Sequence, residues 1–252
     1  MNKLIREGLK EEYITAKNRL VLLDYDGTLV NFTPVPETVI LPGHLTKILT
    51  GLIQSPQSSV YIITGRGFKS IDKILDKLPV NIIADHGAMI RENGIWKNQL
   101  NGDPNWKEKI FPLLNKSALS CPKSFVEEKT FSLSWHYRNA ENKSGYIHSR
   151  ELISILDKII QLYDLKILDG NKVVEIMKKE VGKGKAVQKL VEQNNYDFIL
   201  SVGDDTTDEE MFEYLLSVPG AYSIKVGKGN TFARYKLTGI DDVVLLLKHL
   251  TK

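Results

Sequence analysis

The chain has 252 residues, of which 42% are hydrophobic and 26% are charged, and its formal net charge is +3. This is the composition of an ordinary globular protein, long enough for one large domain or for a core domain that carries a smaller one. Because the positive charges are scattered rather than gathered in a block, the sequence gives little support to nucleic-acid binding. No apolar run approaches the roughly 18 residues expected of a membrane span. The single cysteine, Cys121, excludes an intrachain disulfide and favours a reducing, cytoplasmic compartment.

From about Leu20 the sequence alternates short apolar runs with helical patterns. The run "LVLLDYD" is followed by a predicted helix over 44–53, a strand at "SVYIITGR", a helix near 69–78 and a strand at "VNIIADHG". Runs such as "VYIIT" are apolar without alternation, which is typical of strands that helices cover on both faces. This first part of the chain therefore predicts a layered α/β structure.

The middle of the chain, residues 103–178, has a different pattern. It contains helical segments at "WKEKIFPLLNKSAL" and "KSGYIHSRELISILDKIIQLY", alternating strands at "SFVEEKTFSLSWHYR", and two strands joined by a turn at Asp169-Gly170-Asn171. Two rounds of a helix followed by paired strands predict a small α+β domain. We expect it to be inserted into a core formed by residues 1–102 and 179–252.

The α/β pattern returns in the last part of the chain. A helix at "GKAVQKLVEQ" is followed by a strand at "FILSVGDD", a helix at "DEEMFEYLLS" and a strand at "AYSIKVG". The two parts together predict an α/β fold with a Rossmann-like parallel sheet. In the acidic turn before the second of these helices, Thr207 and Glu210 predict a capping box.

Four polar clusters lie where apolar strands end or helices begin. They are Asp24-Tyr25-Asp26-Gly27-Thr28, Thr64-Gly65-Arg66, Gly182-Lys183-Gly184 and residues 203–209. In an open parallel sheet these positions meet at one edge, where ligands bind. Each cluster alone has a plain structural interpretation, such as a turn, a helix cap or a solvated helix start. Their occurrence together, in this order, favours one shared site.

The residue types of these clusters predict phosphoryl transfer. Asp24 and Asp26 are two positions apart, so on a strand both side chains point to the same side. Two carboxylates so close require a cation, and Asp204 could complete an oxygen-only ligand set of the kind that Mg²⁺ prefers. An aspartate can attack phosphorus while a second carboxyl group carries a proton. Thr64, Lys183 and backbone N–H groups could stabilise the charge on the phosphoryl oxygens.

In their order along the chain, "DYDGT", "ITGR", "GKGK" and "GDDTTDEEMF" resemble the four motifs of the haloacid dehalogenase superfamily of phosphatases. With "ADHGA", "SFVEEKTFSLSWHYR" and "GNKVVEI", they are similar to the trehalose-6-phosphate phosphatase family, especially to phosphatase domains fused to a trehalose-phosphate synthase. The resemblance runs from about Tyr13 to the end of the sequence. It implies a haloacid dehalogenase-type core with an inserted α+β cap that closes over the sugar.

The resemblance also implies roles for single residues. Asp24 would be the nucleophile, and Asp26 the general acid/base whose backbone carbonyl binds the metal. The residues that bind or support Mg²⁺ would be Asp24, Asp26, Asp204, Asp205 and Asp208. The residues that bind the phosphoryl group or line the substrate loops would be Gly27, Thr64, Gly65, Arg66 and Lys183.

Polar residues of the predicted cap match positions with which the family binds the sugar. They are Glu127, Lys129, His136, Arg138 and Glu175. On one unbroken strand, Glu127 and Lys129 would lie on the face opposite His136. A bend between Lys129 and His136 is therefore required if all of them are to meet one sugar. The structural alternative is an ordinary solvated strand face.

We therefore expect a Mg²⁺-dependent phosphatase that hydrolyses trehalose 6-phosphate through an aspartyl-phosphate intermediate, in trehalose biosynthesis. Its substrate is a small sugar phosphate, and a trehalose-phosphate synthase is the expected partner or fused domain. The alternatives are a phosphatase of sucrose phosphate or glycosylglycerate phosphate, and a non-catalytic regulatory domain that binds trehalose phosphate. A dinucleotide-binding module is disfavoured because no G-x-G-x-x-G follows the first predicted strand.

Overall fold

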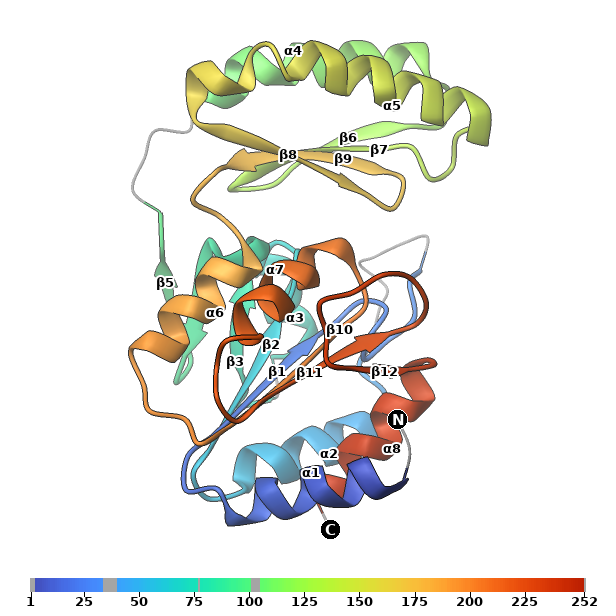
Figure 1. Cartoon of the computed structure of the whole chain (residues 1–252). Coiled ribbons are helices and arrows are strands. Elements are labelled where there is room, and N and C mark those ends of the chain that lie inside the picture. The colour runs from blue at the N-terminus through green and yellow to red at the C-terminus, as the bar shows by residue number, and fades with distance from the viewer. Residues whose placement is uncertain (1–2, 34–39, 77, 101–104, 252) are drawn as a thin grey trace. The chain divides into compact units, whose positions relative to one another are not determined.

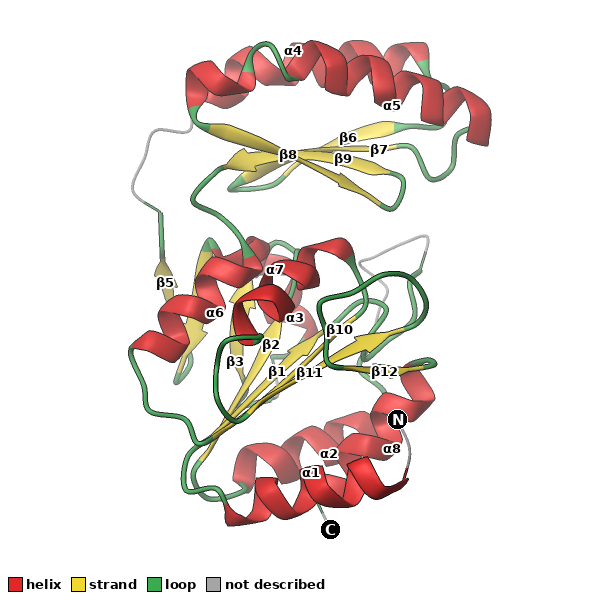
Figure 2. Cartoon of the chain, in the orientation of Figure 1, coloured by secondary structure: helices red, strands yellow, loops and turns green. Residues whose placement is uncertain are grey.

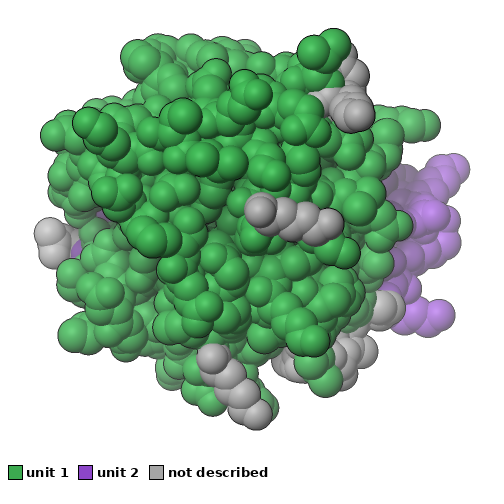
Figure 3. Space-filling view, turned by 90° about the horizontal axis from the view of Figure 1, so that it is seen from below, with its two compact units in different colours: residues 1–99, 182–252 green, residues 100–181 purple. Residues whose placement is uncertain are grey.

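The computed structural model describes residues 3–33, 40–76, 78–100 and 105–251 (Figure 1). The chain divides into two compact units, which Figure 3 distinguishes by colour. We call Met1–Gln99 with Gly182–Lys252 the core unit, and Leu100–Val181 the inserted unit. The insertion leaves the core sheet after its edge strands and returns just before the helix that carries Lys183.

The core unit is built on one eight-stranded sheet with the order β12-β11-β10-β1-β2-β3-β4-β5. Neighbouring strands from β12 to β3 are parallel, whereas β3, β4 and β5 pair antiparallel. This arrangement confirms the predicted α/β fold with a parallel sheet. The strands are β1 (Arg19–Asp24), β2 (Ser58–Ile63), β3 (Asn81–Ala84), β4 (Met89–Glu92), β5 (Ile95–Asn98), β10 (Phe198–Gly203), β11 (Ala221–Val226) and β12 (Tyr235–Leu237).

Helices cover both faces of this sheet (Figures 1 and 2). Figure 1 shows α1, α2 and α8 on one face and α6 and α7 on the other. Every residue of β1 is buried, because Leu20 and Leu22 pack toward α6 and α7 while the alternate residues face the other layer. The helices of the core unit are α1 (Lys3–Thr15), α2 (Gly43–Gln54), α3 (Phe68–Ile74), α6 (Lys183–Glu192), α7 (Thr206–Leu215) and α8 (Ile240–Leu250).

The inserted unit is an antiparallel sheet with its own hydrophobic core. Its strand order is β6-β7-β9-β8, and two helices pack on one face of it (Figure 2). Trp106, Leu133, Trp135, Leu152 and Ile176 belong to the apolar cluster between the helices and the sheet. The elements are α4 (Trp106–Ser120), β6 (Phe125–Glu128), β7 (Ser132–His136), α5 (Asn142–Leu156), η3 (Ile160–Tyr163), β8 (Leu165–Gly170) and β9 (Val173–Lys178).

Several elements differ from the sequence-based expectation. Helix α5 ends at Leu156 rather than continuing to Tyr163, and a separate 3₁₀ turn follows it. The turn between β8 and β9 lies later than expected, because Gly170 already pairs with Val173 and leaves Asn171 and Lys172 in the turn. The structure also adds α1, α8, β12 and the β4–β5 hairpin. Among the described residues, no helix combines the length and the apolar character needed to cross a membrane.

Candidate active site

The candidate site lies at the carboxyl ends of β1, β2 and β10. Asp24 is the last residue of β1, Thr64 follows β2, and Gly203 is the last residue of β10. Strand β1 pairs in parallel with both neighbours, so that Asp24 lies opposite Ile63 and Leu23 lies opposite Val202. The register therefore brings the first, second and fourth polar clusters to one edge of the sheet, as the alternating pattern predicts.

Lys183 joins the third cluster to this edge. Its ammonium group donates to Asp24 Oδ1 at 2.7 Å and to Asp208 Oδ1 at 2.8 Å. All three side chains are almost completely buried. Burial alone would lower the pKa of Lys183, but the carboxylates of Asp208 and Asp24 outweigh it and raise that pKa above its ordinary value. Lys183 is therefore a permanently charged cation inside an acidic site.

Asp208 organises the turn between β10 and α7. Its Oδ2 accepts the backbone N–H groups of Asp204 at 2.9 Å and Asp205 at 3.0 Å, while its Oδ1 accepts from Lys183. Both oxygens are thus engaged within the protein. The carboxylate of Asp205 accepts the N–H of Thr206 at 2.6 Å and caps α7, with Asp208 as the other half of the capping box.

The predicted capping box of Thr207 and Glu210 is therefore wrong. Helix α7 already begins at Thr206, so Thr207 is inside its first turn and Asp205 is the N-cap residue. The physical reason is that the Asp205 carboxylate, directly after the strand, reaches the first unpaired N–H groups of the helix.

Asp204 is held by the turn that follows β1. Thr28, which sequence reasoning left without a role, donates its hydroxyl to Asp204 Oδ1 at 3.3 Å and is fully buried. Gly27 has φ +85°, and a Cβ atom at that position would lie 2.2 Å from Asp204 Oδ2. This position requires glycine, because both the backbone conformation and the close approach of the carboxylate exclude a side chain.

Three carboxylates converge beside Lys183. One oxygen each from Asp24, Asp204 and Asp208 lies within 4.8 Å of the others. Burial raises the pKa of Asp24 well above its ordinary value; the charge of Lys183 opposes this rise, whereas the charges of Asp208 and Asp204 add to it. Burial, with Asp208 and Asp205, raises the pKa of Asp204 to about 6. Three acids against one ammonium group leave an excess of buried negative charge.

These residues fit a divalent cation, the kind of cofactor that the site's chemistry and the fold family imply. Asp24 Oδ2 is buried and accepts no hydrogen bond from any described residue. Asp24 and Asp204 would hold the cation, because both oxygens of Asp208 are already engaged. An all-oxygen set of one or two carboxylates, completed by water and phosphate oxygens, suits a small hard cation.

The side chain of Asp26 pairs with Arg66. Arg66 donates from Nε to Asp26 Oδ2 at 2.6 Å and from Nη2 to Asp26 Oδ1 at 2.7 Å. Among the described residues, the acidic cluster does not include Asp26. That Asp24 and Asp26 share one cation stays a prediction. Strand β1 ends at Asp24, so the two-residue alternation of a strand does not extend to Asp26.

The loop Thr64-Gly65-Arg66 is held by a second, strained turn. Thr64 Oγ1 accepts the backbone N–H of Arg66 at 3.1 Å. The turn Asp85–Gly87 (η2) donates from Asp85 N to Arg66 O at 2.8 Å and from His86 N to Thr64 O at 3.1 Å. Asp85 and His86 both have positive φ, at 48° and 55°. A Cβ at Gly65 would lie 2.3 Å from the His86 ring. The turn within "ADHGA" therefore packs directly against the loop Thr64-Gly65-Arg66 and holds its backbone in place.

A polar cluster lies on the sheet of the inserted unit. Lys129 donates to Glu175 at 3.0 Å, Ser132 donates to the same oxygen, and His136 Nε2 lies 2.8 Å from Glu127 Oε2. The bend that the sequence requires is the β6–β7 turn, which follows Glu128. Burial opposes a low pKa for Glu127, but the hydrogen bond from His136 and the charge of Lys129 lower it.

Arg138 and Phe125 also lie at this sheet, near the polar cluster. Arg138 lies beyond the end of β7 and donates to the carbonyl of Asn171 at 2.9 Å, at the β8–β9 turn. Phe125, which sequence reasoning did not single out, stacks on the ring of His136 with a centroid distance of 4.8 Å. The alternating pattern placed Phe125 on the same face as Glu127, so the signal for this contact was present in the sequence.

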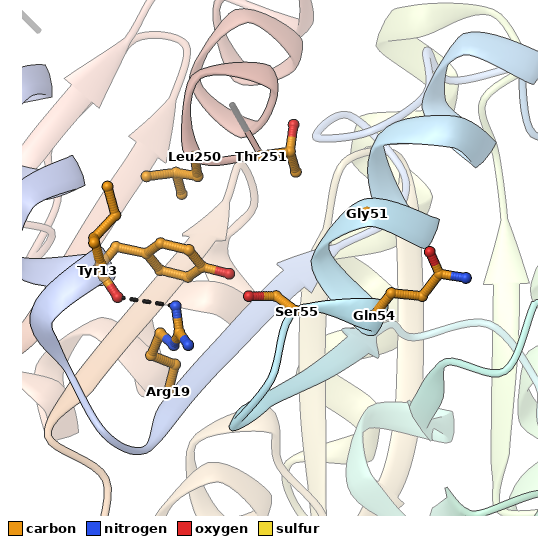
Figure 4. A pocket seen from close by; sticks show the side chains of 8 residues that line it. Tyr13, Arg19, Gly51, Gln54, Ser55, Leu250 and Thr251 are labelled. Carbon is orange, nitrogen blue, oxygen red and sulfur yellow. Dashed lines mark hydrogen bonds between the residues drawn. The ribbon is translucent and has the colours of Figure 1, made fainter.

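A separate hollow of the core unit, about 340 Å³ in volume, lies at the other end of β1 (Figure 4). It is lined by Tyr13, Ile14, Arg19, Gly51, Gln54, Ser55, Leu250 and Thr251. Arg19 donates to the carbonyl oxygen of Tyr13, in the last turn of α1, and to that of Pro56, just after α2. Carbonyl groups at the end of a helix carry partial negative charge, which favours a cation. None of the predicted site residues lines this hollow, so it is distinct from the acidic site.

The fold defines the class of structure to which the chain belongs. A parallel sheet presents an acid at the end of β1, a threonine after β2, a lysine at the start of α6 and acids after β10. A solved haloacid dehalogenase-like hydrolase from B. subtilis shares this fold with a TM-score of 0.67 and 16% sequence identity, over 92% of this chain and 99% of that one.

The particular family follows from the sequence matches. The trehalose-phosphatase family model matches residues 22–238, and the chain therefore belongs to this family. It is 38% identical to a bifunctional trehalose-6-phosphate synthase/phosphatase of Thermoproteus tenax, over 99% of this chain and 34% of that protein. The C-terminal domain of C. albicans trehalose-6-phosphate phosphatase matches with a TM-score of 0.92 and 28% identity, over 98% of this chain and 96% of that one. The chain spans about a third of the length of the first curated relatives.

Proposed function

We propose that this chain hydrolyses trehalose 6-phosphate to trehalose and phosphate, with Asp24 as the nucleophile. The observation that carries the proposal is the buried Lys183, which pairs with Asp24 Oδ1 and leaves the other oxygen of the same carboxylate without a hydrogen bond from the described residues. Lys183 thus fixes the direction of the carboxylate, which has oxygens for both the attack and the cation. The names of the T. tenax and C. albicans relatives support trehalose 6-phosphate as the substrate.

In the first step, a carboxylate oxygen of Asp24 attacks phosphorus while the bond from phosphorus to the sugar oxygen breaks. Asp26 donates a proton to the leaving sugar oxygen, which departs as the hydroxyl of trehalose. Lys183 keeps Asp24 charged and oriented, and its charge together with the Thr64 hydroxyl and the backbone N–H groups of the loop stabilises the phosphoryl oxygens.

In the second step, water attacks the phosphorus of the aspartyl-phosphate. Asp26, now a carboxylate, takes a proton from that water, phosphate is formed, and the Asp24 carboxylate is regenerated. A divalent cation held by Asp24 and Asp204, which we propose to be Mg²⁺, would neutralise charge on the transferring phosphoryl group. Asp205 and Asp208 position the loop that carries Asp204.

We propose that the inserted unit is the cap that recognises the sugar. The paired groups Glu127–His136 and Lys129–Glu175 offer both acceptors and donors for sugar hydroxyls. In each pair a carboxylate is already oriented by its partner, which reduces the conformational entropy lost on binding. Arg138 and Phe125, at the edges of the same sheet, would border this surface.

We further propose that the chain acts with a trehalose-phosphate synthase in a cytoplasmic compartment. The T. tenax relative is named as both synthase and phosphatase, and such a pairing would deliver the substrate directly. The single cysteine, Cys121, is buried and free, which agrees with a reducing environment.

A phosphate-release assay over a panel of sugar phosphates tests the substrate. The panel contains trehalose 6-phosphate, sucrose 6-phosphate, a glucosylglycerate phosphate and glucose 6-phosphate, each with Mg²⁺, and the Asp24→Asn variant serves as the blank. We expect kcat/KM for trehalose 6-phosphate to exceed that of the others by about 10²-fold or more, since a polar site discriminates strongly among hydroxyl patterns.

Two outcomes would contradict this proposal. A higher kcat/KM for another sugar phosphate would retain the chemistry and replace the substrate. No phosphate release from any member of the panel, with trehalose phosphate still bound, would favour the non-catalytic regulatory domain. That alternative has no support from the core motifs, because Asp24, Asp26, Lys183 and Asp204 are all present.

A further inference from the structure

We propose that Arg66 is a positioning residue for proton transfer: it sets the place and orientation of the Asp26 carboxyl group rather than binding the substrate. The inference rests on the proposed function, in which Asp26 carries the proton. Its basis is a two-pronged contact in which Nε and Nη2 of Arg66 each donate to a different oxygen of Asp26, at 2.6 Å and 2.7 Å. A planar guanidinium that meets a carboxylate in this way fixes both its direction and its rotation.

The backbone on both sides of this contact is fixed. Asp26 lies in a turn in which Gly27 N donates to Val30 O at 2.7 Å and Val30 N donates to Tyr25 O at 3.1 Å. Arg66 is held through Thr64 Oγ1 on its N–H and Asp85 N on its carbonyl. Only the side-chain torsions of Asp26 and Arg66 remain to be set, and the ion pair sets them together.

The side chain of Arg66 is also held by packing against Tyr25 and by burial. Its Cζ lies 5.5 Å from the centroid of the Tyr25 ring, so the guanidinium packs over the residue between the two aspartates of the first motif. The side chain of Arg66 is 9% exposed, whereas that of Asp26 is 21% exposed. The more accessible member of the pair is therefore the carboxylate, as proton exchange with a substrate requires.

The contact distinguishes Arg66 from Lys183, the other cation of the site. Lys183 bonds Asp24 and Asp208, which belong to the acidic cluster, whereas the Arg66 side chain donates to both carboxylate oxygens of Asp26. The two cations thus serve different aspartates of one motif. Lys183 orients the nucleophile, and Arg66 orients the proton carrier.

A leaving-group series tests this assignment without using any sugar. Values of kcat/KM are measured for aryl phosphates whose leaving phenols span a wide range of acidity, from 2,4-dinitrophenyl to phenyl phosphate. kcat/KM reports the step that expels the leaving group, and only basic leaving groups need a proton from Asp26. For Arg66→Gln we expect a loss of about 10²-fold with phenyl phosphate and less than about 5-fold with the dinitrophenyl ester.

A double-mutant cycle with Asp26→Asn completes the test. If Arg66 acts through Asp26, the double variant loses no more activity toward phenyl phosphate than Asp26→Asn alone, because the two residues form one functional unit. Arg66→Lys, which keeps the charge but loses the two-pronged geometry, should recover part of the loss and provides a second variant if Arg66→Gln unfolds. Arg91→Gln is the matched control, since Arg91 is equally buried at 9% and pairs with Asp72 in the same unit.

Three results would overturn the inference. An equal loss across all leaving groups would place Arg66 on the transferring phosphoryl group. An unchanged series in a folded Arg66→Gln variant would remove its role altogether. Additive losses in the double variant would show that Arg66 acts independently of Asp26. Failure of the proposed function is distinguished from these, because it requires a parent protein without phosphatase activity or full activity in Asp24→Asn.

Discussion

The acidic site of the core unit and the polar cluster of the inserted unit differ in the burial of their polar side chains and in the sequence separation of the residues that they pair. In the core, Lys183, Asp24 and Asp208 are 3%, 6% and 0% exposed, and their bonds connect segments that lie far apart in the sequence. In the inserted unit, the side chains of His136 and Glu127 are 26% and 46% exposed and lie on adjacent strands of one hairpin. The core holds its charges buried, whereas in the inserted unit the Glu127–His136 pair is open to its surroundings and only the Lys129–Glu175 pair, 13% and 5% exposed, is buried.

This difference indicates a division of labour. Buried charges cost free energy unless they are paired. In the core site, Lys183 compensates part of the negative charge of the carboxylates, and a bound cation would compensate the rest. Exposed pairs contribute little to stability, and their pattern is free to follow the hydroxyl groups of a substrate. We therefore expect variants of the core to affect the reaction itself and variants of the insert to affect the choice of substrate.

The largest effect should follow from Lys183→Met. The variant leaves Asp24 and Asp208 buried without their cation, so we expect activity to fall by about 10³-fold or more and the free energy of unfolding to fall by about 3–5 kcal/mol. Steady-state kinetics and denaturant unfolding measure the two effects. Lys225→Met is the matched control, because Lys225 is similarly buried but pairs with Glu209. Full activity in Lys183→Met would contradict the expectation that variants of the core affect the reaction itself.

The second effect concerns pH and metal in the core. The folded chain raises the pKa of Asp204 to about 6, above the unfolded value near 3.9, so it binds a proton more tightly than the unfolded chain does. Without metal, this group therefore makes stability fall as pH rises from about 4 to about 6. A divalent cation competes with that proton, so Mg²⁺ should raise the Tm clearly at pH 7.5 and little at pH 5.

Differential scanning calorimetry with and without Mg²⁺ measures this dependence. A cation at about 100 times its Kd stabilises by about 2.7 kcal/mol, which corresponds to several degrees for a chain of this size. Asp204→Asn is the control and should remove the metal-dependent shift. An equal shift in that variant would show that the cation binds elsewhere.

A smaller and more selective effect is expected in the insert. Glu127→Gln removes the charge that pairs with His136, so KM for trehalose 6-phosphate should rise by about 10-fold, the loss of about 1.4 kcal/mol of binding. kcat/KM for 4-nitrophenyl phosphate should remain unchanged, because that substrate has no sugar to recognise. Equal changes for both substrates would contradict a recognition role for this region.

The smallest effect should come from an exposed pair of the same unit. Arg150 and Asp169 form a two-bond contact, but their side chains are 40% and 42% exposed. Asp169→Asn should change the free energy of unfolding by less than about 1 kcal/mol and leave both substrates unaffected. A large kinetic effect of Asp169→Asn would mean that the insert acts as a whole rather than through the Glu127 and Glu175 pairs.

The core site was largely predictable because its main signal is topological. Apolar runs ending in Asp24, Thr64 and Gly203 specify parallel strands, and parallel strands place their carboxyl ends together whatever their separation along the chain. The pairing of Asp26 with Arg66 was not predictable in the same way. Side chains in turns follow no period, and β1 ends at Asp24, so the alternation rule does not specify the direction of the Asp26 side chain.

Other misses had signals that could have been used. Asn93-Gly94 between two short apolar runs is a strong hairpin signal, and it lies at the turn between β4 and β5. The capping box of α7 was misplaced because several acids and threonines in succession each fit the pattern, and only the helix start selects Asp205. Helix α1 was overlooked because its charged residues conceal the apolar face that buries Leu9 and Tyr13.

The central claim is that Asp24 forms a covalent bond with phosphorus, and trapping that bond tests it most directly. The protein is mixed with excess substrate and Mg²⁺, quenched during turnover, reduced with borohydride and digested for mass spectrometry. An acyl phosphate at Asp24 predicts conversion of this residue to homoserine, which Asp24→Asn and a substrate-free sample lack. Rapid turnover with no reduced residue at position 24, or with the reduced residue at another aspartate, would contradict the account.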